Sequence, residues 1–245
     1  NLNTLFNENR KYYMLLIKAL RTFDDTKALN KFLIKPLISF ESQLFETTAG
    51  QNILKDTLGA EPISKILKDY DSIGVVGTSK KEDGVRKEEI VGYLIPQIIK
   101  LYEPQIIAGC IRDPIQAGIL GDVIDRCLEL SKGPEFIENI LQIIIGSCQS
   151  IDDSLIVNAI SHKIVKKLLK SLLANPQFPK LSTSSILHFI KNNLISLLKT
   201  KGIFVIISCM EGSDEVKKEF SVILKNAKLP GDDVQGMKVL RSLIH

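Results

Sequence analysis

One helical pattern recurs six times along this chain and limits its fold more than any other feature. A small or polar reference residue is followed by mainly apolar residues three, four, seven and eight positions later, which is the spacing of one face of an α-helix. The intervals between the reference positions are 38, 66, 45, 41 and 34 residues, and these positions are Tyr12, Gly50, Gln116, Ser161, Gly202 and Gly236. Such intervals, with one insertion, are typical of stacked helical repeats. We therefore expect an all-α fold, an α-solenoid similar to the armadillo and HEAT superhelices.

Three of the six reference positions are glycines, at Gly50, Gly202 and Gly236. Glycine near a helix start costs about 0.5–1 kcal/mol relative to alanine. The recurrence of glycine at the same position of the pattern therefore predicts that neighbouring backbone packs too closely there for a side chain.

Two copies of the pattern run into a second helix-start signal. Asp24-Asp25-Thr26 precedes Leu29, Phe32 and Leu33, and Gly212-Ser213-Asp214 precedes Val216, Phe220 and Leu224. Asp, Ser and Thr accept hydrogen bonds from the first N–H groups of a helix. The repeating unit is therefore predicted to be helix, tight turn, helix. Residues 203–207 have a β-prone composition, but their phase matches the other copies and favours a helix.

Composition fits a soluble helical chain of one extended domain or two sub-arrays, because 44% of the 245 residues are hydrophobic and only 6% are aromatic. The four cysteines lack the C-x-x-C spacing of metal sites, and we expect them to be reduced core residues. No apolar stretch reaches the roughly 18–20 residues that a membrane-spanning helix needs. The Gly-rich and charged stretch 71–86 predicts an exposed insertion into an array that occupies residues 1–245.

Charge is unevenly distributed, although the formal net charge is only +4. No Asp or Glu occurs from Ser154 to Met210, whereas that stretch contains the lysines at positions 163, 166, 167, 170, 180, 191, 199 and 201. An anionic partner would relieve the repulsion among such lysines, and nucleic-acid phosphate is the first candidate. A plainly solvated lysine face, an acidic protein and a membrane surface are the alternatives.

These features together resemble the C-terminal half of the Puf-A-like, non-classical pumilio (Puf repeat) family. The resemblance is carried by four segments in their shared order: Asp24 to Lys27, Thr47 to Gly50, Ser79 to Glu89, and the two final copies through Lys201-Gly202 and Gln235-Gly236. It implies three-helix repeats whose signature helices line one face. It also implies that the first, second and fifth residues after each reference position face RNA.

Those positions do not form a base-reading code in this chain. One repeat places Ala117, Gly118 and Gly121 there, and none of these side chains can make bidentate contacts to a base edge. Lysine and arginine at such positions suit phosphate, whereas Phe204 and Tyr13 could either stack on bases or pack inside the array. The predicted nucleic-acid-binding residues are Lys55, Lys163, Lys166, Lys167, Lys201, Lys238 and Arg241.

The resemblance implies sequence-independent binding of RNA, and also of DNA, in the nucleus and nucleolus. The expected role is large ribosomal subunit biogenesis and pre-rRNA processing, with messenger-RNA repression and localisation as a further role. Implied partners are pre-rRNA, mRNA and pre-ribosomal proteins, with the chain as a monomer that needs no membrane.

Enzyme chemistry is not expected. The chain has no nucleophile elbow and no phosphate-binding loop, and its three histidines lack metal-ligand spacing. Asp152-Asp153 and Asp232-Asp233 are explained by helix capping. We therefore expect no catalytic residue, metal or cofactor. The alternative function is a helical-repeat scaffold that grips a protein partner through apolar grooves.

Overall fold

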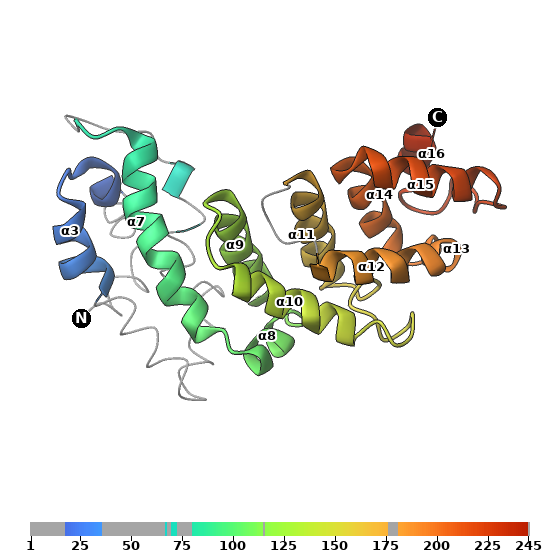
Figure 1. The fold of residues 1–245 in the computed structure, drawn as a ribbon, viewed down its shortest axis with the longest axis horizontal. Helices are drawn as coiled ribbons and strands as arrows, with labels where there is room; N and C mark the ends of the chain where they lie inside the picture. Colours follow the sequence, from blue (N-terminus) through green and yellow to red (C-terminus); the bar gives the residue numbers. More distant parts are fainter. Residues whose placement is uncertain are drawn as a thin grey trace. The chain divides into compact units, whose positions relative to one another are not determined.

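The computed structural model describes residues 18–35, 67, 70–72, 80–114, 116–175 and 181–244, which form helices and turns and contain no β-strand (Figure 1). The predicted all-α class is therefore confirmed for this part of the chain. The repeat copy that begins at Gly50 lies outside the described residues, as do the copy that begins at Tyr12 up to residue 17, and Lys55 and Lys180. None of the described helices is long and apolar enough to pass through a lipid bilayer.

The chain divides into two compact units. Unit 1 consists of residues 1–103 and 118–133, and unit 2 consists of residues 104–117 and 134–245. Unit 1 contains α3 (Thr26–Leu29), the π-helix η1 (Asn30–Ile34), the 3-10 helices η2 (Tyr70–Ser72) and η3 (Ile99–Leu101), α7 (Asp83–Ile98), and α9 (Gln116–Glu129) apart from its first two residues. Unit 2 contains α8 (Pro104–Cys110), α10 (Pro134–Gly146), α11 (His162–Ala174), α12 (Leu181–Asn192), α13 (Leu194–Leu197), α14 (Gly202–Gly212), α15 (Asp214–Lys225) and α16 (Met237–Ile244).

The four described copies of the pattern all begin helices where the sequence predicts them. Helix α9 starts at Gln116, α11 directly after Ser161, α14 at Gly202 and α16 directly after Gly236. In the Gln116, Ser161 and Gly202 copies, every predicted stripe residue is at most 8% exposed. The Gly236 copy differs, because Val239 is 49% exposed while Leu240 is buried.

Helix α14 explains how the β-prone residues 203–207 adopt a helix. It packs against α11, α13, α15 and α16, so eight of its residues are buried. Burial on every side favours any large apolar side chain that fits, and this outweighs the modest helix propensities of valine and isoleucine. The tight turn after α14 is also confirmed, since the Ser213 side chain accepts a hydrogen bond from the Val216 N–H at the start of α15.

At Gly202 and Gly236, the two reference glycines that the structure describes, the nearest atoms are side-chain atoms and not the predicted backbone. At Gly236 the decisive feature is a positive φ of 95°, which disfavours residues with a side chain. At Gly202 a Cβ would meet side-chain atoms of Leu197 and Thr200, which lie just before it in the chain. The close backbone contact is at Gly212, where a Cβ would lie 2.8 Å from the Lys170 carbonyl oxygen of α11.

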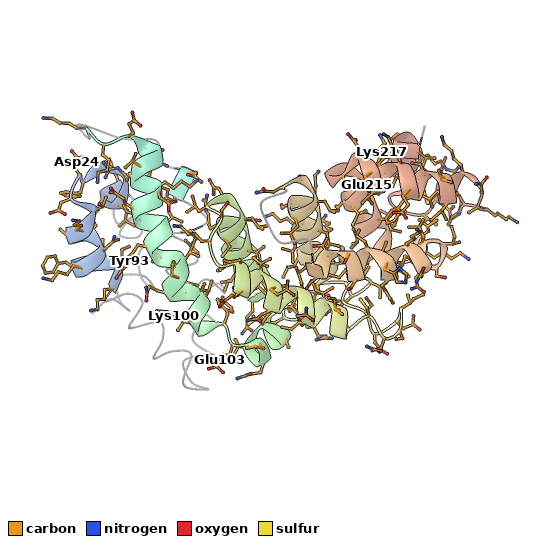
Figure 2. The ribbon with its side chains drawn as sticks, viewed as in Figure 1. Asp24, Tyr93, Lys100, Glu103, Glu215 and Lys217 are labelled. Carbon is orange, nitrogen blue, oxygen red and sulfur yellow. The ribbon has the colours of Figure 1, made fainter. Side chains whose placement is uncertain are left out.

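Unit 1 is held together by three arginines that are at most 9% exposed. Arg86, at 0% exposure, pairs with Asp24 at 2.8 Å and donates to the Phe23 carbonyl. Figure 2 labels Asp24, close to the start of α7. Arg21 pairs with Asp83 at 2.8 Å and donates to the Tyr70 carbonyl, which ties the chain before α3 to the first residue of α7.

The third arginine joins η2 to α9. Arg126 donates from Nε to the Leu67 carbonyl at 2.7 Å and pairs with Asp71 at 2.6 Å and Glu129 at 2.5 Å. Lys87 of α7 contacts both of the same carboxylates. Distant parts of the chain are therefore joined by charge-assisted hydrogen bonds, which are stronger than neutral ones.

Two exposure patterns differ from the sequence analysis. Phe32, an apolar residue of the second helix predicted after Asp24-Asp25-Thr26, is 71% exposed. The stretch 71–86 is not simply an exposed insertion either, because its last four residues begin α7 and Arg86 is fully buried. The sequence alone did not reveal the burial of Arg86, because a run of charged residues does not show which of them will form ion pairs in the folded protein.

Replacing Gly212 with alanine should destabilise unit 2 by about 1–3 kcal/mol, because the new methyl group overlaps the backbone of α11. Gly109→Ala in α8 is the control, since nothing lies within 4 Å of its added Cβ. Thermal or urea unfolding measures both variants. Equal unfolding free energies for the two would contradict the packing argument.

Arg86→Ala should lower the free energy of unfolding by about 3 kcal/mol, since it removes an ion pair, a buried hydrogen bond and a fully buried side chain together. Lys100→Ala is the matched control, because Lys100 is an exposed cation at the other end of α7 (Figure 2). Urea titration followed by circular dichroism provides the comparison. A loss no larger than that of the control would show that the buried arginine contributes little.

Candidate nucleic-acid interface

The candidate interface lies at the start of α11 and α14 in unit 2. These two helices pack along each other and are parallel, because His162 lies near Phe204 at one end and Lys170 lies beside Glu211 and Gly212 at the other. Their N-terminal ends are therefore neighbours. The first N–H groups of both helices are hydrogen-bonded within the preceding turns, and the helix dipoles add partial positive charge at these two ends.

A tightly bonded turn fixes the start of α11. The Asn158 side chain accepts from the N–H groups of Ile160 at 3.0 Å and Ser161 at 3.1 Å, and the Ser161 hydroxyl donates to the Leu155 carbonyl at 2.8 Å. His162 contacts the Asn158 carbonyl through Nδ1 at 2.9 Å. The first residues of α11, including Lys163 and Lys166, are therefore held on a rigid support.

Phe204 is the centre of the arrangement. The ammonium groups of Lys166 and Lys201 lie 5.9 and 5.7 Å from the centroid of its ring, within cation–π range. The His162 ring lies 6.0 Å from the same centroid. We call Lys163, Lys166 and Lys201, with His162 and Phe204, the basic cluster.

The basic cluster affects the titration of His162. This side chain is 6% exposed, and burial lowers its pKa below the ordinary value of 6.5. The positive charges of Lys166, Lys201 and Lys163 lower the pKa further, while the hydrogen bond to the Asn158 backbone opposes the shift. Lys163 lies one helical turn before Lys166 on α11, and Lys166 and Lys201 both lie against the Phe204 ring, so the three lysines share this end of the two helices.

The lysines of the acid-free stretch do not all have the same environment. Lys170 pairs with Glu211 at 2.6 Å, and Lys191 pairs with Glu219. Both glutamates follow Met210 in the sequence, so tertiary packing supplies the acids that the stretch lacks. By contrast, no acidic partner among the described residues contacts Lys163, Lys166 or Lys201.

The start of α16 adjoins the basic cluster. A Cβ on Gly236 would lie 3.4 Å from the Phe204 ring, and Lys201 Nζ lies 3.5 Å from the Gln235 side-chain oxygen. Lys238 is exposed on α16 just beyond this point. Arg241 lies one turn further and is already bound by Asp232 at 2.9 Å and by the Pro230 carbonyl.

The structure thus gathers three of the seven predicted binding residues, Lys163, Lys166 and Lys201. Lys167 is exposed beside them on α11, Lys238 lies on α16, Arg241 is engaged in an ion pair, and Lys55 falls outside the described residues. His162 and Phe204 were not among the seven. The sequence signal for them was their place just after two reference residues, since His162 is the first residue after Ser161 and Phe204 is the second after Gly202.

The described residues do not form the metal or paired-carboxylate sites considered in the sequence analysis. No group of three His, Cys, Asp or Glu side chains suited to a metal occurs within the described ranges. Asp153 bonds to Ser150, and Asp232 is held by Arg241. All four cysteines are free thiols, of which three are buried as predicted and Cys148 is only partly buried. Burial raises the pKa of Cys127 and of Cys209 to about 12, which keeps both as neutral thiols.

The folded-state pKa of His162 should lie below 6.5, so the unfolded chain binds more protons than the folded one between the two values. The contribution of His162 to the free energy of unfolding is therefore fully present above pH 6.5, and it is lost as the pH drops toward the folded-state pKa. NMR titration of the imidazole measures this pKa. Lys166→Gln should raise the pKa of His162 part of the way toward 6.5. A wild-type pKa at or above 6.5 would contradict the burial of His162 and the nearby positive charge.

No curated protein and no solved structure matches this chain. One family model does match, and it covers residues 54–181, just over half of the 245 residues. The match includes Lys163 and Lys166 but ends before Lys201 and Phe204, so it covers only part of the basic cluster. On this match, the chain belongs to the CPL (NUC119) domain family, a family of helical domains.

Proposed function

We propose that this chain binds RNA through the phosphate backbone, with the basic cluster of unit 2 as the contact surface. The observation that carries this proposal is the grouping of Lys163, Lys166 and Lys201 at two adjacent helix N-termini with no acidic partner among the described residues. Three ammonium groups and two positive helix ends repel one another. A phosphate strand replaces that repulsion with attraction.

The chemistry of the cluster favours binding without sequence preference. Lysine ammonium groups act as point charges toward phosphate and position a strand without reading its bases. Because phosphates are common to both nucleic acids, single-stranded DNA is expected to bind as well. At three positions that the resemblance assigns to base contacts, no side chain can read a base edge, because Gly118 and Gly121 have none and Ala117 is only 6% exposed.

The parallel packing of α11 and α14 supports a repeat architecture for unit 2. In a solenoid, corresponding helices of successive repeats lie side by side in the same direction. His162 and Gly202 begin such a pair, with α12 and α13 between them in the sequence. A pumilio-like array of this kind would carry the cationic helix ends along one edge, where a strand could follow them.

The cellular part of the proposal rests on the resemblance to Puf-A-like proteins. It places the chain in the nucleolus, as a monomer that contacts pre-rRNA and pre-ribosomal proteins during large-subunit biogenesis. Repression and localisation of mRNA form a further proposed role. Fluorescence microscopy of the tagged chain, together with crosslinking to RNA, tests these points independently of affinity in solution.

The decisive experiment compares two triple variants with the same charge change. Lys163→Gln, Lys166→Gln and Lys201→Gln together should weaken binding of a random single-stranded RNA by about tenfold or more at about 50 mM salt. The slope of log K against log salt should also fall by about 2, since each contact to a single strand contributes about 0.7. Fluorescence anisotropy measures both quantities.

The control triple is Lys170→Gln, Lys191→Gln and Lys217→Gln, in the same unit (Figure 2 labels Lys217). Two of these lysines already have glutamate partners. If the cluster is the contact surface, the control triple should retain most of the affinity. Equal losses in the two triples would mean that only overall charge matters, and that outcome would remove the basis of the proposed site.

A further inference from the structure

A second surface lies in unit 1, around two exposed phenylalanines. Phe23 is 61% exposed and Phe32 is 71% exposed. Together with Asp25, Ala28, Leu29 and Leu33 they line a cavity of about 300 Å³, which we call the aromatic groove. A cavity of this volume is at the small end of binding pockets and holds one or two apolar side chains.

Phe32 is exposed because another side of the same helical segment packs against α7. Thr26 and Ile34 are at most 4% exposed, and the Asn30 amide donates to the Glu89 carbonyl of α7 at 3.2 Å. The segment therefore turns one side toward α7 and presents the other to solvent. Residues Asn30–Ile34 form a π-helix, a rare geometry that is frequent at functional sites.

Positive charge borders the aromatic groove. Lys27, Lys31 and Lys35 recur at every fourth residue, so they follow one side of the segment, and all three are exposed. The Lys31 ammonium lies 5.1 Å from the centroid of the Phe32 ring. No ion pair joins these lysines to another described residue. The single carboxylate in the groove, that of Asp25, caps α3 by accepting from the Ala28 N–H at 2.9 Å.

We propose that the aromatic groove binds a short acidic segment of a partner protein, which inserts a large apolar side chain between Phe23 and Phe32. Its carboxylates face Lys27, Lys31 and Lys35. The aliphatic side chains of Ala28, Leu29 and Leu33 favour a peptide over a nucleic-acid strand, because bases stack on flat rings whereas an aliphatic cavity is filled by a side chain. This surface is separate from the basic cluster and does not depend on RNA binding.

Selection from a phage library of random dodecapeptides tests the proposal on the full chain. The immobilised protein should enrich sequences in which Leu, Phe or Trp is flanked by Asp or Glu. A synthetic peptide of the enriched sequence should bind the Phe23→Ser, Phe32→Ser double variant about tenfold or more weakly. Lys27→Gln, Lys31→Gln and Lys35→Gln together should weaken binding and reduce its dependence on salt.

Val222→Ser is the matched control, since Val222 is also largely exposed, at 63%, but lies in unit 2. It should bind the peptide as the wild type does. Circular dichroism checks that each variant keeps its helices. The proposal is overturned if wild type and double variant enrich the same peptides, or if the enriched peptides are basic. It is also overturned if the double variant loses only RNA binding, or only self-association measured by sedimentation.

Discussion

The close parallel packing of α11 against α14 is the constraint on which the candidate interface depends. Gly212 makes it possible, because any side chain there would strike the Lys170 carbonyl of α11. Since the two helices run in the same direction, contact at their C-terminal ends also fixes their N-terminal ends as neighbours. The position of the basic cluster therefore depends partly on Gly212, at the opposite end of the helix pair. Gly212 is not itself part of the proposed contact surface.

The two units use positive charge differently. In unit 1 the guanidinium groups of Arg21, Arg86 and Arg126 are buried and meet carboxylates or backbone carbonyls, so they hold chain segments together. In unit 2 the ammonium groups of Lys166 and Lys201 lie against Phe204, Lys163 is exposed one turn away on α11, and none of the three has an acidic partner among the described residues. The first arrangement satisfies its charges within the protein. The second leaves electrostatic attraction available for an external anion.

The sequence indicated the region of the candidate interface, but it identified only some of the residues that form it. The acid-free stretch pointed to α11 and the start of α14, because local charge is visible in the sequence. It did not distinguish Lys170 and Lys191 from the lysines of the basic cluster, since their partners Glu211 and Glu219 lie outside that stretch. Arg241 was likewise included, although its ion pair with Asp232 depends on how the loop before α16 folds.

By itself, the sequence determined the all-helical class, the starts of α9, α11, α14 and α16, and the buried stripe of the first three. Those features follow from periodicity and from local hydrogen bonding, which depend on residues a few positions apart. Only the tertiary structure decided that Arg86 is buried, that Phe32 faces solvent, and that Lys166 and Lys201 meet at Phe204. Each of these depends on side chains contributed by helices distant in the chain, and no local pattern specifies which of them will meet.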